Sequence, residues 1–249
     1  MAIRLKVINP NTTGSMTRHV GEAARAVAPD DVEVDAVSPA MGPVSIEGHY
    51  DEALAAIGVL DEVRQGEAEG VDGYVIACFG DPGLQAAREL ATGPVVGIAE
   101  AAFHAASFVG RSFAIVTTLE RTLGRARDLV DSYGFSRQCV AYRACEVPVL
   151  GLEEDFEGSY EALRSECLRS LAEDGPDAIV LGCAGMAAMC GRLEDELQIP
   201  VIDGVAAGTM FAAALVRIGV GSPSRGEFAP PLPKRIDGIL RPFELNGGQ

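Results

Sequence analysis

Two segments of the chain match each other and contain its best candidates for chemistry: VDGYVIACFGDPG at 71–83 and PDAIVLGCAGMAA at 176–188. In each, an Asp precedes an apolar run that ends in a cysteine, Cys78 or Cys183, and a glycine-containing stretch follows. The interval between the two aspartates equals the interval between the two cysteines. Two thiols on opposite sides of one cleft could remove a proton from one face of a carbon atom and return one to the other face.

The matching register continues beyond the cysteines. GPVVGIAEAA at 93–102 is echoed by IPVIDGVAAG at 199–208. Self-similarity held over this length predicts an internal duplication, with the two cysteines at equivalent positions of two halves. We therefore expect the halves to face each other across one site.

The cysteines must be positioned by an alternation of strands and helices. Short β-branched runs predict strands at 3–9, 32–36, 73–78, 94–98, 113–117, 139–143, 178–183 and 200–203. Ala- and Glu-rich segments predict helices at 13–27, 51–69, 82–91, 100–108, 120–132, 157–174, 186–197 and 205–217. This order predicts an α/β fold of two similar lobes, each a mostly parallel sheet flanked by helices. Both cysteines end strands, where such folds carry their functional loops.

The predicted division places a first lobe at 1–110 and a second lobe at 111–204, with the active site between them. We expect the last helix, 205–220, to pack back on the first lobe. Residues 221–249 contain many Pro, Gly and charged residues and predict an extended tail. A surface-crossing segment, a subunit contact and a disordered tail all stay open for this stretch.

Composition limits the partners. The 249 residues are 48 % hydrophobic and carry a net charge of −16, which disfavours nucleic acid and anionic membranes as partners. No apolar run approaches the roughly 18 residues of a membrane span, and the N-terminus lacks the pattern of a signal peptide. The six cysteines form no CxxC pair and the three histidines do not combine with them at zinc-finger spacing. These features predict a cytoplasmic protein with reduced thiols and no metal site.

The residues after each cysteine could tune its thiol. Asp81 and Pro82 fit the N-cap and first residue of a helix, which would place the Cys78 thiol near a helix N-terminus that favours an anion. Backbone amides beside both cysteines could also stabilise an enolate oxygen. These are the amides of Phe79, Gly80, Ala184 and Gly185. A small buried cysteine at a strand end is the structural alternative, and the matched pair argues against it.

Polar residues end the first strand of each half. Asn11 follows the first predicted strand, and Thr117 and Thr118 end the corresponding strand of the second half. Thr117-x-x-Glu120 also fits a helix capping box. Because Asn and Thr cap helices routinely, capping and substrate contact both stay open for these residues.

Several of these segments together resemble one protein family. They are VINPNTT at 7–13, GPVSIEG at 42–48, ACFGDPG at 77–83, GIAEAA at 97–102 and GCAGM at 182–186. They are similar to segments of the aspartate/glutamate/hydantoin racemase superfamily, and most similar to its hydantoin and allantoin racemase branch. CFGDPG together with GPxSIEG is specific to that branch, and the resemblance covers nearly the whole chain.

The resemblance implies a racemase that needs no cofactor. It implies Cys78 and Cys183 as an acid–base pair that moves a proton at C5 of a cyclic ureide, either a 5-substituted hydantoin or allantoin. It also implies a homo-oligomer of two-lobed subunits. The implied substrate-binding residues are Asn11, Val44, Phe79, Gly80, Thr117, Thr118, Gly182 and Ala184.

Other functions stay open. An enzyme like arylmalonate decarboxylase shares the implied fold but needs only the second cysteine, so Cys78 argues against it. An enzyme like maleate isomerase uses one of two cysteines as a covalent nucleophile, and the CFGDPG context argues against that. A non-catalytic protein that clamps a small ligand between its lobes would need neither thiol. The sequence does not identify the C5 substituent.

Overall fold

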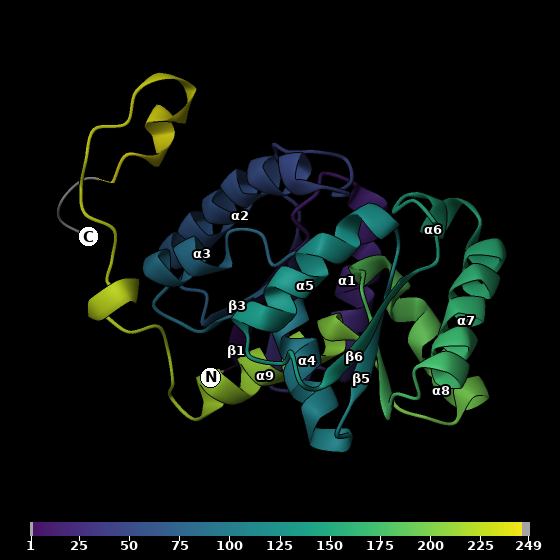
Figure 1. Cartoon of the computed structure of the whole chain (residues 1–249). Coiled ribbons are helices and arrows are strands. Elements are labelled where there is room, and N and C mark those ends of the chain that lie inside the picture. Colours follow the sequence, from purple (N-terminus) through teal and green to yellow (C-terminus); the bar gives the residue numbers. More distant parts are fainter. Residues whose placement is uncertain (1, 246–249) are drawn as a thin grey trace.

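The computed structural model describes residues 2–245 and contains two parallel β-sheets flanked by helices (Figure 1). Residue 1 of the predicted first lobe and residues 246–249 of the predicted tail lie outside the described residues. The predicted α/β class with two sheet-centred lobes is confirmed.

The two sheets have the same topology. The first has the order β2-β1-β3-β4 and the second the order β6-β5-β7-β8, and every pair of neighbours is parallel. The first sheet contains β1 (Ile3–Ile8), β2 (Val32–Val37), β3 (Gly73–Ile76) and β4 (Val95–Gly97). The second contains β5 (Phe113–Thr117), β6 (Cys139–Ala144), β7 (Ala178–Leu181) and β8 (Val201–Ile202). The repeat in the sequence thus corresponds to a repeat in strand order.

Helices connect the strands as the alternation predicts. They are α1 (Gly14–Val27), α2 (His49–Glu69), α3 (Leu84–Leu90), α4 (Ile98–Val109), α5 (Leu123–Ser132), α6 (Gly151–Glu154), α7 (Phe156–Glu173), α8 (Cys190–Leu197) and α9 (Gly204–Arg217). Short 3₁₀ helices occur at η1 (Glu120–Thr122), η2 (Ala184–Met189), η3 (Gly226–Phe228) and η4 (Gly238–Phe243). The one-turn α6 was not predicted, because four residues are too few to show a helical period.

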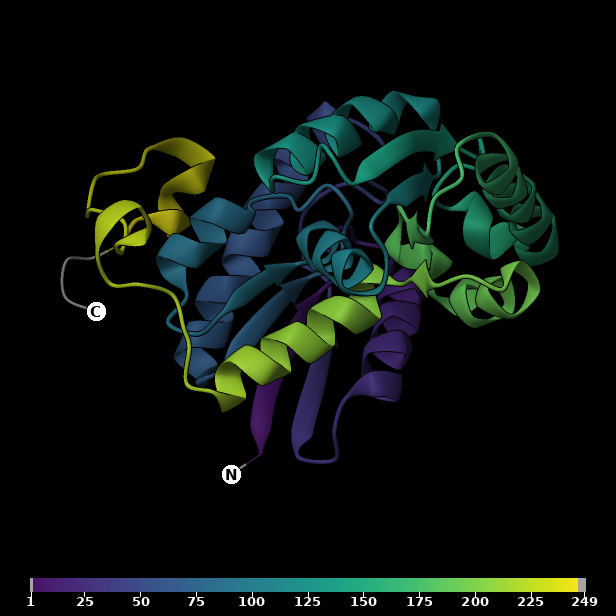
Figure 2. The ribbon, with the colours of Figure 1, turned by 60° about the horizontal axis from the view of Figure 1, so that its bottom comes forward.

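The two halves exchange helices. Helix α9 follows the last strand of the second sheet but packs on β1, β3 and β4 of the first (Figure 2). Helix α4 follows the last strand of the first sheet and packs on β7 of the second. There Phe103 stacks on Phe113, with ring centroids 5.5 Å apart, and meets Phe79 edge-on. This reciprocal packing buries apolar area across the boundary and holds the carboxyl ends of both sheets together.

The C-terminal segment leaves the main body after α9 (Figure 1). It contains η3 and η4 and returns to α2, where the Arg64 guanidinium lies 5.2 Å from the centre of the Phe243 ring. Its Ile239 side chain is 95 % exposed. Within residues 2–245, no helix has both the length and the apolar character that a membrane crossing needs.

Candidate active site

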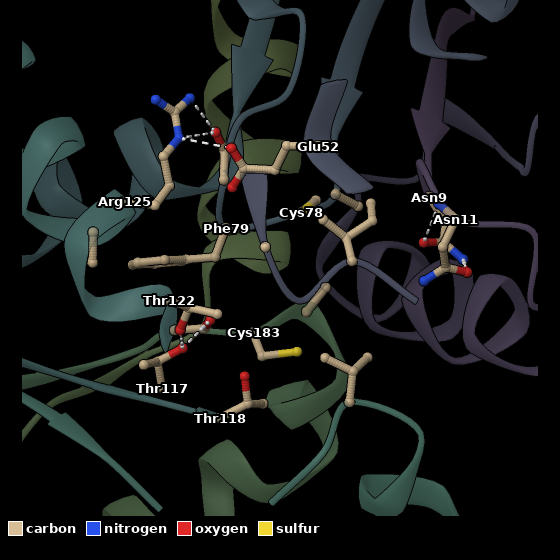
Figure 3. A pocket seen from close by; sticks show the side chains of 18 of the residues that line it. Asn9, Asn11, Glu52, Cys78, Phe79, Thr117, Thr118, Thr122, Arg125 and Cys183 are labelled. Atoms are coloured by element: carbon tan, nitrogen blue, oxygen red, sulfur yellow. Dashed lines mark hydrogen bonds and ion pairs between the residues drawn. The ribbon is translucent and has the colours of Figure 1, made fainter. Parts of the chain in front are cut away.

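The carboxyl ends of both sheets border one cavity, with a volume of about 60 Å³ (Figure 3). Nine of the ten residues that the sequence nominates for the site line it. They are Asn11, Cys78, Phe79, Gly80, Thr117, Thr118, Gly182, Cys183 and Ala184. Residues far apart in the chain thus meet at one place because both sheets end there.

The tenth residue, Val44, does not line the cavity. Its side chain is 60 % exposed, and its carbonyl oxygen accepts a hydrogen bond from Thr13 Oγ1 at 2.7 Å. Ile46, two residues further on, lines the cavity instead. The loop therefore reaches the site, but through a different side chain.

The two cysteines lie on opposite sides of the cavity (Figure 3). Cys78 follows β3 and Cys183 follows β7, and both side chains are half-buried. Burial raises the pKa of the Cys78 thiol well above its usual range, and the nearby carboxylate of Glu52 acts in the same direction. Burial also raises the pKa of Cys183 to about 11. Both thiols are therefore neutral in the free protein near neutral pH.

This result corrects the expectation of a thiol favoured as an anion. The backbone N–H groups of Gly80 and Gly185 do lower the pKa values of Cys78 and Cys183, respectively, but burial outweighs them. Helix α3 begins only at Leu84, so the thiol of Cys78 is not next to its first turn. Desolvation thus decides the direction at both positions.

Asp81 does not cap the helix that follows it, contrary to prediction. Its φ of 45° lies in the left-handed region, and its carboxylate accepts hydrogen bonds from the amides of Ala99 and Glu100 at 3.1 Å each. It therefore caps α4, a later helix, and also accepts a bond from the hydroxyl of Tyr133 at 2.9 Å. Burial raises the pKa of Asp81 to about 6, while these three donors favour the carboxylate. Asp81 ties the Cys78 turn to both halves.

The predicted capping box at Thr117 is also wrong. Thr117 Oγ1 donates to the carbonyl oxygen of Gly182 at 2.9 Å, and the amide of Glu120 bonds to the carboxylate of Glu146 instead. Thr117 therefore fixes the residue before Cys183. A Cβ on Gly182 would lie 2.5 Å from Thr117 Cβ, so this close approach requires glycine.

Polar groups remain available toward the cavity. Asn11 Oδ1 accepts bonds from Asn9 Nδ2 and from the amide of Thr13, both at 2.9 Å, which orients the side chain. Among the described residues, its Nδ2 donates a hydrogen bond only to the weak acceptor Met16 Sδ, at 3.4 Å. Within residues 2–245, no hydrogen bond engages the hydroxyl of Thr118, which lies beside Cys183 in Figure 3. Both groups could bond to a ligand.

Sequence reasoning missed an ion pair in the wall. Glu52 comes from α2 and Arg125 from α5, and Arg125 Nε lies 3.2 Å from Glu52 Oε2. Arg125 Nε and Nη2 also donate to the carbonyl oxygen of Gly80, at 3.2 and 2.7 Å. Burial raises the pKa of Glu52 and Arg125 opposes that shift. On a predicted amphipathic helix, a single Glu or Arg looks like any solvated residue, so no sequence signal marks these two.

Other residues that were not named as site residues also line the cavity. They include Asn9, Met16, Ile46, Gly48, Thr122, Ala126 and Val149. Asn9 lies in the VINPNTT segment, and Ile46 and Gly48 lie in the GPVSIEG segment, so the sequence had marked their segments but not these residues. Among the described residues, no group of three or more His, Cys, Asp and Glu side chains has a metal-binding arrangement.

Comparison with known proteins assigns the chain to a family. The family model described as Asp/Glu/Hydantoin racemase matches residues 5–212. The chain belongs to the Asp/Glu/hydantoin racemase family. The matched range includes both cysteine turns and strands of both sheets.

Similar proteins match this chain over nearly its whole length. A hydantoin racemase from Pseudomonas sp. (strain NS671) is 47 % identical over 244 residues, which are 98 % of each chain. The solved structure of an allantoin racemase from Klebsiella pneumoniae has 52 % identity and a TM-score of 0.96, and the match covers 98 % of this chain and 99 % of that one. An allantoin racemase from Pseudomonas fluorescens has 37 % identity and a TM-score of 0.91, with 95 % and 100 % covered.

Proposed function

We propose that this protein racemises 5-substituted hydantoins or allantoin by a two-base 1,1-proton transfer at C5, with Cys78 and Cys183 as the bases. The observation that carries the proposal is the position of the two thiols on opposite sides of one cavity. The similarity to a hydantoin racemase and to an allantoin racemase supports the substrate class. No cofactor takes part in the proposed reaction.

The proton transfer begins when one thiol loses its proton to solvent water and becomes a thiolate. The thiolate takes the proton from C5, and the electron pair of that C–H bond moves into an enolate whose charge lies on the C4 oxygen. The other thiol then gives its proton to the opposite face of C5. The product is the other enantiomer, and the two cysteines have exchanged protonation states.

Hydrogen-bond donors would hold the enolate. Phe79, Gly80 and Ala184 of the two cysteine turns line the cavity together with Asn11, so their backbone N–H groups and Asn11 Nδ2 are the donors we assign to the enolate oxygen. Fixed donors in a small, partly desolvated site stabilise developing charge more than water does. The raised thiol pKa values also fit the task, because a more basic thiolate is a stronger acceptor for a carbon-bound proton.

The first test follows the C5 proton. One enantiomer of a 5-substituted hydantoin and (S)-allantoin are each incubated in D₂O, with and without enzyme, and followed by NMR and optical rotation. Loss of the C5–H signal together with loss of rotation is expected for at least one substrate. Absence of both changes on both substrates would overturn the proposal and leave the decarboxylase, isomerase and ligand-binding alternatives.

The second test separates the two cysteines. Cys78→Ala and Cys183→Ala should each lower racemisation by about a thousandfold or more, since a positioned acid or base supplies roughly 10²–10⁴ in rate. Each variant should still exchange the C5 proton of one enantiomer with solvent, through the remaining thiol, and the two variants should prefer opposite enantiomers. Near-normal racemisation by Cys78→Ala would overturn the two-base assignment, and a cysteine–substrate adduct in mass spectrometry would favour the isomerase.

A further inference from the structure

Two equivalent loops of the duplicated fold meet at the cavity. The loop 38–48 joins β2 to α2 in the first half, and the loop 145–150 joins β6 to α6 in the second. Because β2 and β6 hold the same place in the two sheets, the duplication brings both loops to the same site. Ile46 and Gly48 from the first loop and Val149 from the second line the cavity. This part of the wall therefore comes from both halves.

One hydrogen bond joins the two loops. The backbone amide of Val149 donates to Glu47 Oε1 at 2.8 Å. Between residues 38–48 and 145–150, which all lie in the described part of the chain, it is the only hydrogen bond. Burial dominates the raised pKa of Cys183, and the charge of Glu47 contributes to it. Glu47 thus belongs to the first half but lies near the thiol of the second.

The two loops differ in how they are anchored. The first is fixed close to the bond, because the amide of Glu47 itself donates to Asp51 Oδ2 in the first turn of α2, at 3.0 Å. The second is fixed at its start, where the amide of Cys145 donates to the carbonyl oxygen of Thr117 at 3.0 Å. Further along this loop, the carboxylate of Glu47 holds the amide of Val149. Glu47 is therefore an anchored acceptor to which the second loop attaches.

The cavity is small for a substrate ring. Its volume of about 60 Å³ is well below the roughly 300–1,000 Å³ of typical ligand pockets. Part of the wall must therefore move outward to admit a hydantoin and return around it. Helices α4 and α9 pack across the boundary between the halves, so the sheets stay fixed to each other while loops move. The bond between Glu47 and Val149 is the contact that a separation of the two loops would open.

We propose that Glu47 is a positioning residue that closes the site: its carboxylate holds the 145–150 loop over the bound substrate, and its bond to Val149 opens for entry and release. The inference rests on the proposed function. In the closed form, Ile46 and Val149 restrict the ring and exclude water from the reacting atoms. Glu47 also gives the GPVSIEG segment a contribution to the site that Val44 does not supply.

Two substitutions of Glu47 separate its hydrogen bond from its charge. Glu47→Ala removes the acceptor, and kcat/KM should fall by about 10- to 100-fold, the range for a hydrogen bond to a charged group. Glu47→Gln loses the charge but keeps an oxygen that accepts from Val149, so kcat/KM should return to within about fivefold of the unmodified value. The assay uses whichever of the two substrates, hydantoin or (S)-allantoin, the unmodified enzyme racemises faster.

A matched control uses another contact between the halves. His19 Nδ1 lies 2.8 Å from Glu153 Oε1, which joins α1 to α6, and neither residue lines the cavity. His19→Ala should leave kcat/KM within about threefold, since an exposed ion pair contributes little. Urea unfolding shows whether each variant is folded. If Glu47→Ala does not fold, Glu47→Met takes its place, because it keeps the size of the side chain and still lacks the acceptor.

The second measurement is the access of solvent to Cys183. Iodoacetamide should modify Cys183 in Glu47→Ala at least about threefold faster than in Glu47→Gln, because the loop opens more often when its bond is missing. Both variants remove the charge of Glu47, so its effect on the thiolate fraction cancels in this comparison. Peptide mass spectrometry over a time course gives the rates.

Each other outcome overturns the inference. A loss of kcat/KM in Glu47→Gln as large as in Glu47→Ala would mean that the charge, and not the bond to Val149, is needed. Unchanged kcat/KM in Glu47→Ala, or equal alkylation rates in the two variants, would mean that Glu47 does not close the site. An unmodified enzyme that racemises neither substrate would overturn the proposed function, whereas the alkylation rates would still decide whether Glu47 holds the loop.

Discussion

The two cysteine turns occupy equivalent positions in the two halves but are held by different forces. Polar bonds hold the Cys78 turn: Arg125 donates to the Gly80 carbonyl, and Tyr133 donates to the carboxylate of Asp81. Arg125 lies in α5 of the second half, and Tyr133 directly follows that helix. The Cys78 turn is therefore tied to the opposite half by charged and hydrogen-bonding groups, in addition to the apolar packing of Phe79.

Apolar packing holds the Cys183 turn. After Cys183 the chain enters η2 directly, and η2 packs on α1 and α9 of the first half's core. Ala184 belongs to the same buried cluster as Leu5 and Val20, and Met186 is fully buried. The comparison shows that a duplicated fold can place two cysteines at equivalent positions while different contacts hold the turn around each of them. Changes to the two supports should therefore have different effects.

The largest expected effect comes from the polar support. Asp81→Ala should lower the free energy of unfolding by about 3 kcal/mol, because it leaves two helix amides and a tyrosine hydroxyl without their buried acceptor. It should also lower kcat/KM by more than about tenfold, since the Cys78 turn loses its tie to α4. Urea unfolding and a racemisation assay measure the two changes. Unchanged kcat/KM in the folded variant would show that the turn holds its shape without Asp81.

The next effect concerns pH. The pKa of Cys183 is raised to about 11, so below that value its thiolate fraction grows with pH. Because kcat/KM reports the free enzyme, it should rise by about tenfold per pH unit between about pH 6 and 8. The measurement is a pH–rate profile corrected for uncatalysed exchange of the substrate. A maximum near neutral pH would mean that the protein holds one thiolate already formed, against the dominance of burial.

A smaller expected effect is a difference in reactivity between the two thiols. Burial raises the pKa of Cys78 further than that of Cys183, so Cys183 has the larger thiolate fraction at a given pH. Iodoacetamide should therefore modify Cys183 before Cys78, since the thiolate is the reacting species. Peptide mass spectrometry over a time course gives the order. Earlier modification of Cys78 would show that access, and not ionisation, controls reactivity here.

The smallest effect is expected at a helix cap that, unlike Asp81, supports no cysteine turn. Asp203 is the N-cap of α9 and accepts bonds from the amides of Val205 and Ala206, neither of which belongs to a cysteine turn. Asp203→Ala should cost about 1 kcal/mol in the free energy of unfolding, the usual value for a lost cap. Its kcat/KM should stay within about threefold of the unmodified value. A loss of activity as large as that of Asp81→Ala would erase the distinction between the two supports.

Local sequence was sufficient to predict a structural element where the pattern lies within that element. The strands were predictable because β-branched runs are bounded by Gly, Pro and polar residues, and most helices because their apolar residues repeat with a helical period. The cysteines and Asn11 could be nominated because each follows a strand. Asp81 was assigned to the wrong helix because its sequence context fits an N-cap, while its actual partners are 18 and 19 residues further along the chain.

The sequence by itself therefore determined the repeated α/β framework, the family and the pair of thiols at matching strand ends. Only the tertiary structure decided that α4 and α9 cross between the halves, that burial outweighs the nearby amides at both thiols, and that Glu52 and Arg125 meet in the cavity wall. The physical reason is the range of the interactions. Strand and helix preferences act between neighbours in the chain, whereas desolvation and ion pairing depend on groups that folding brings together.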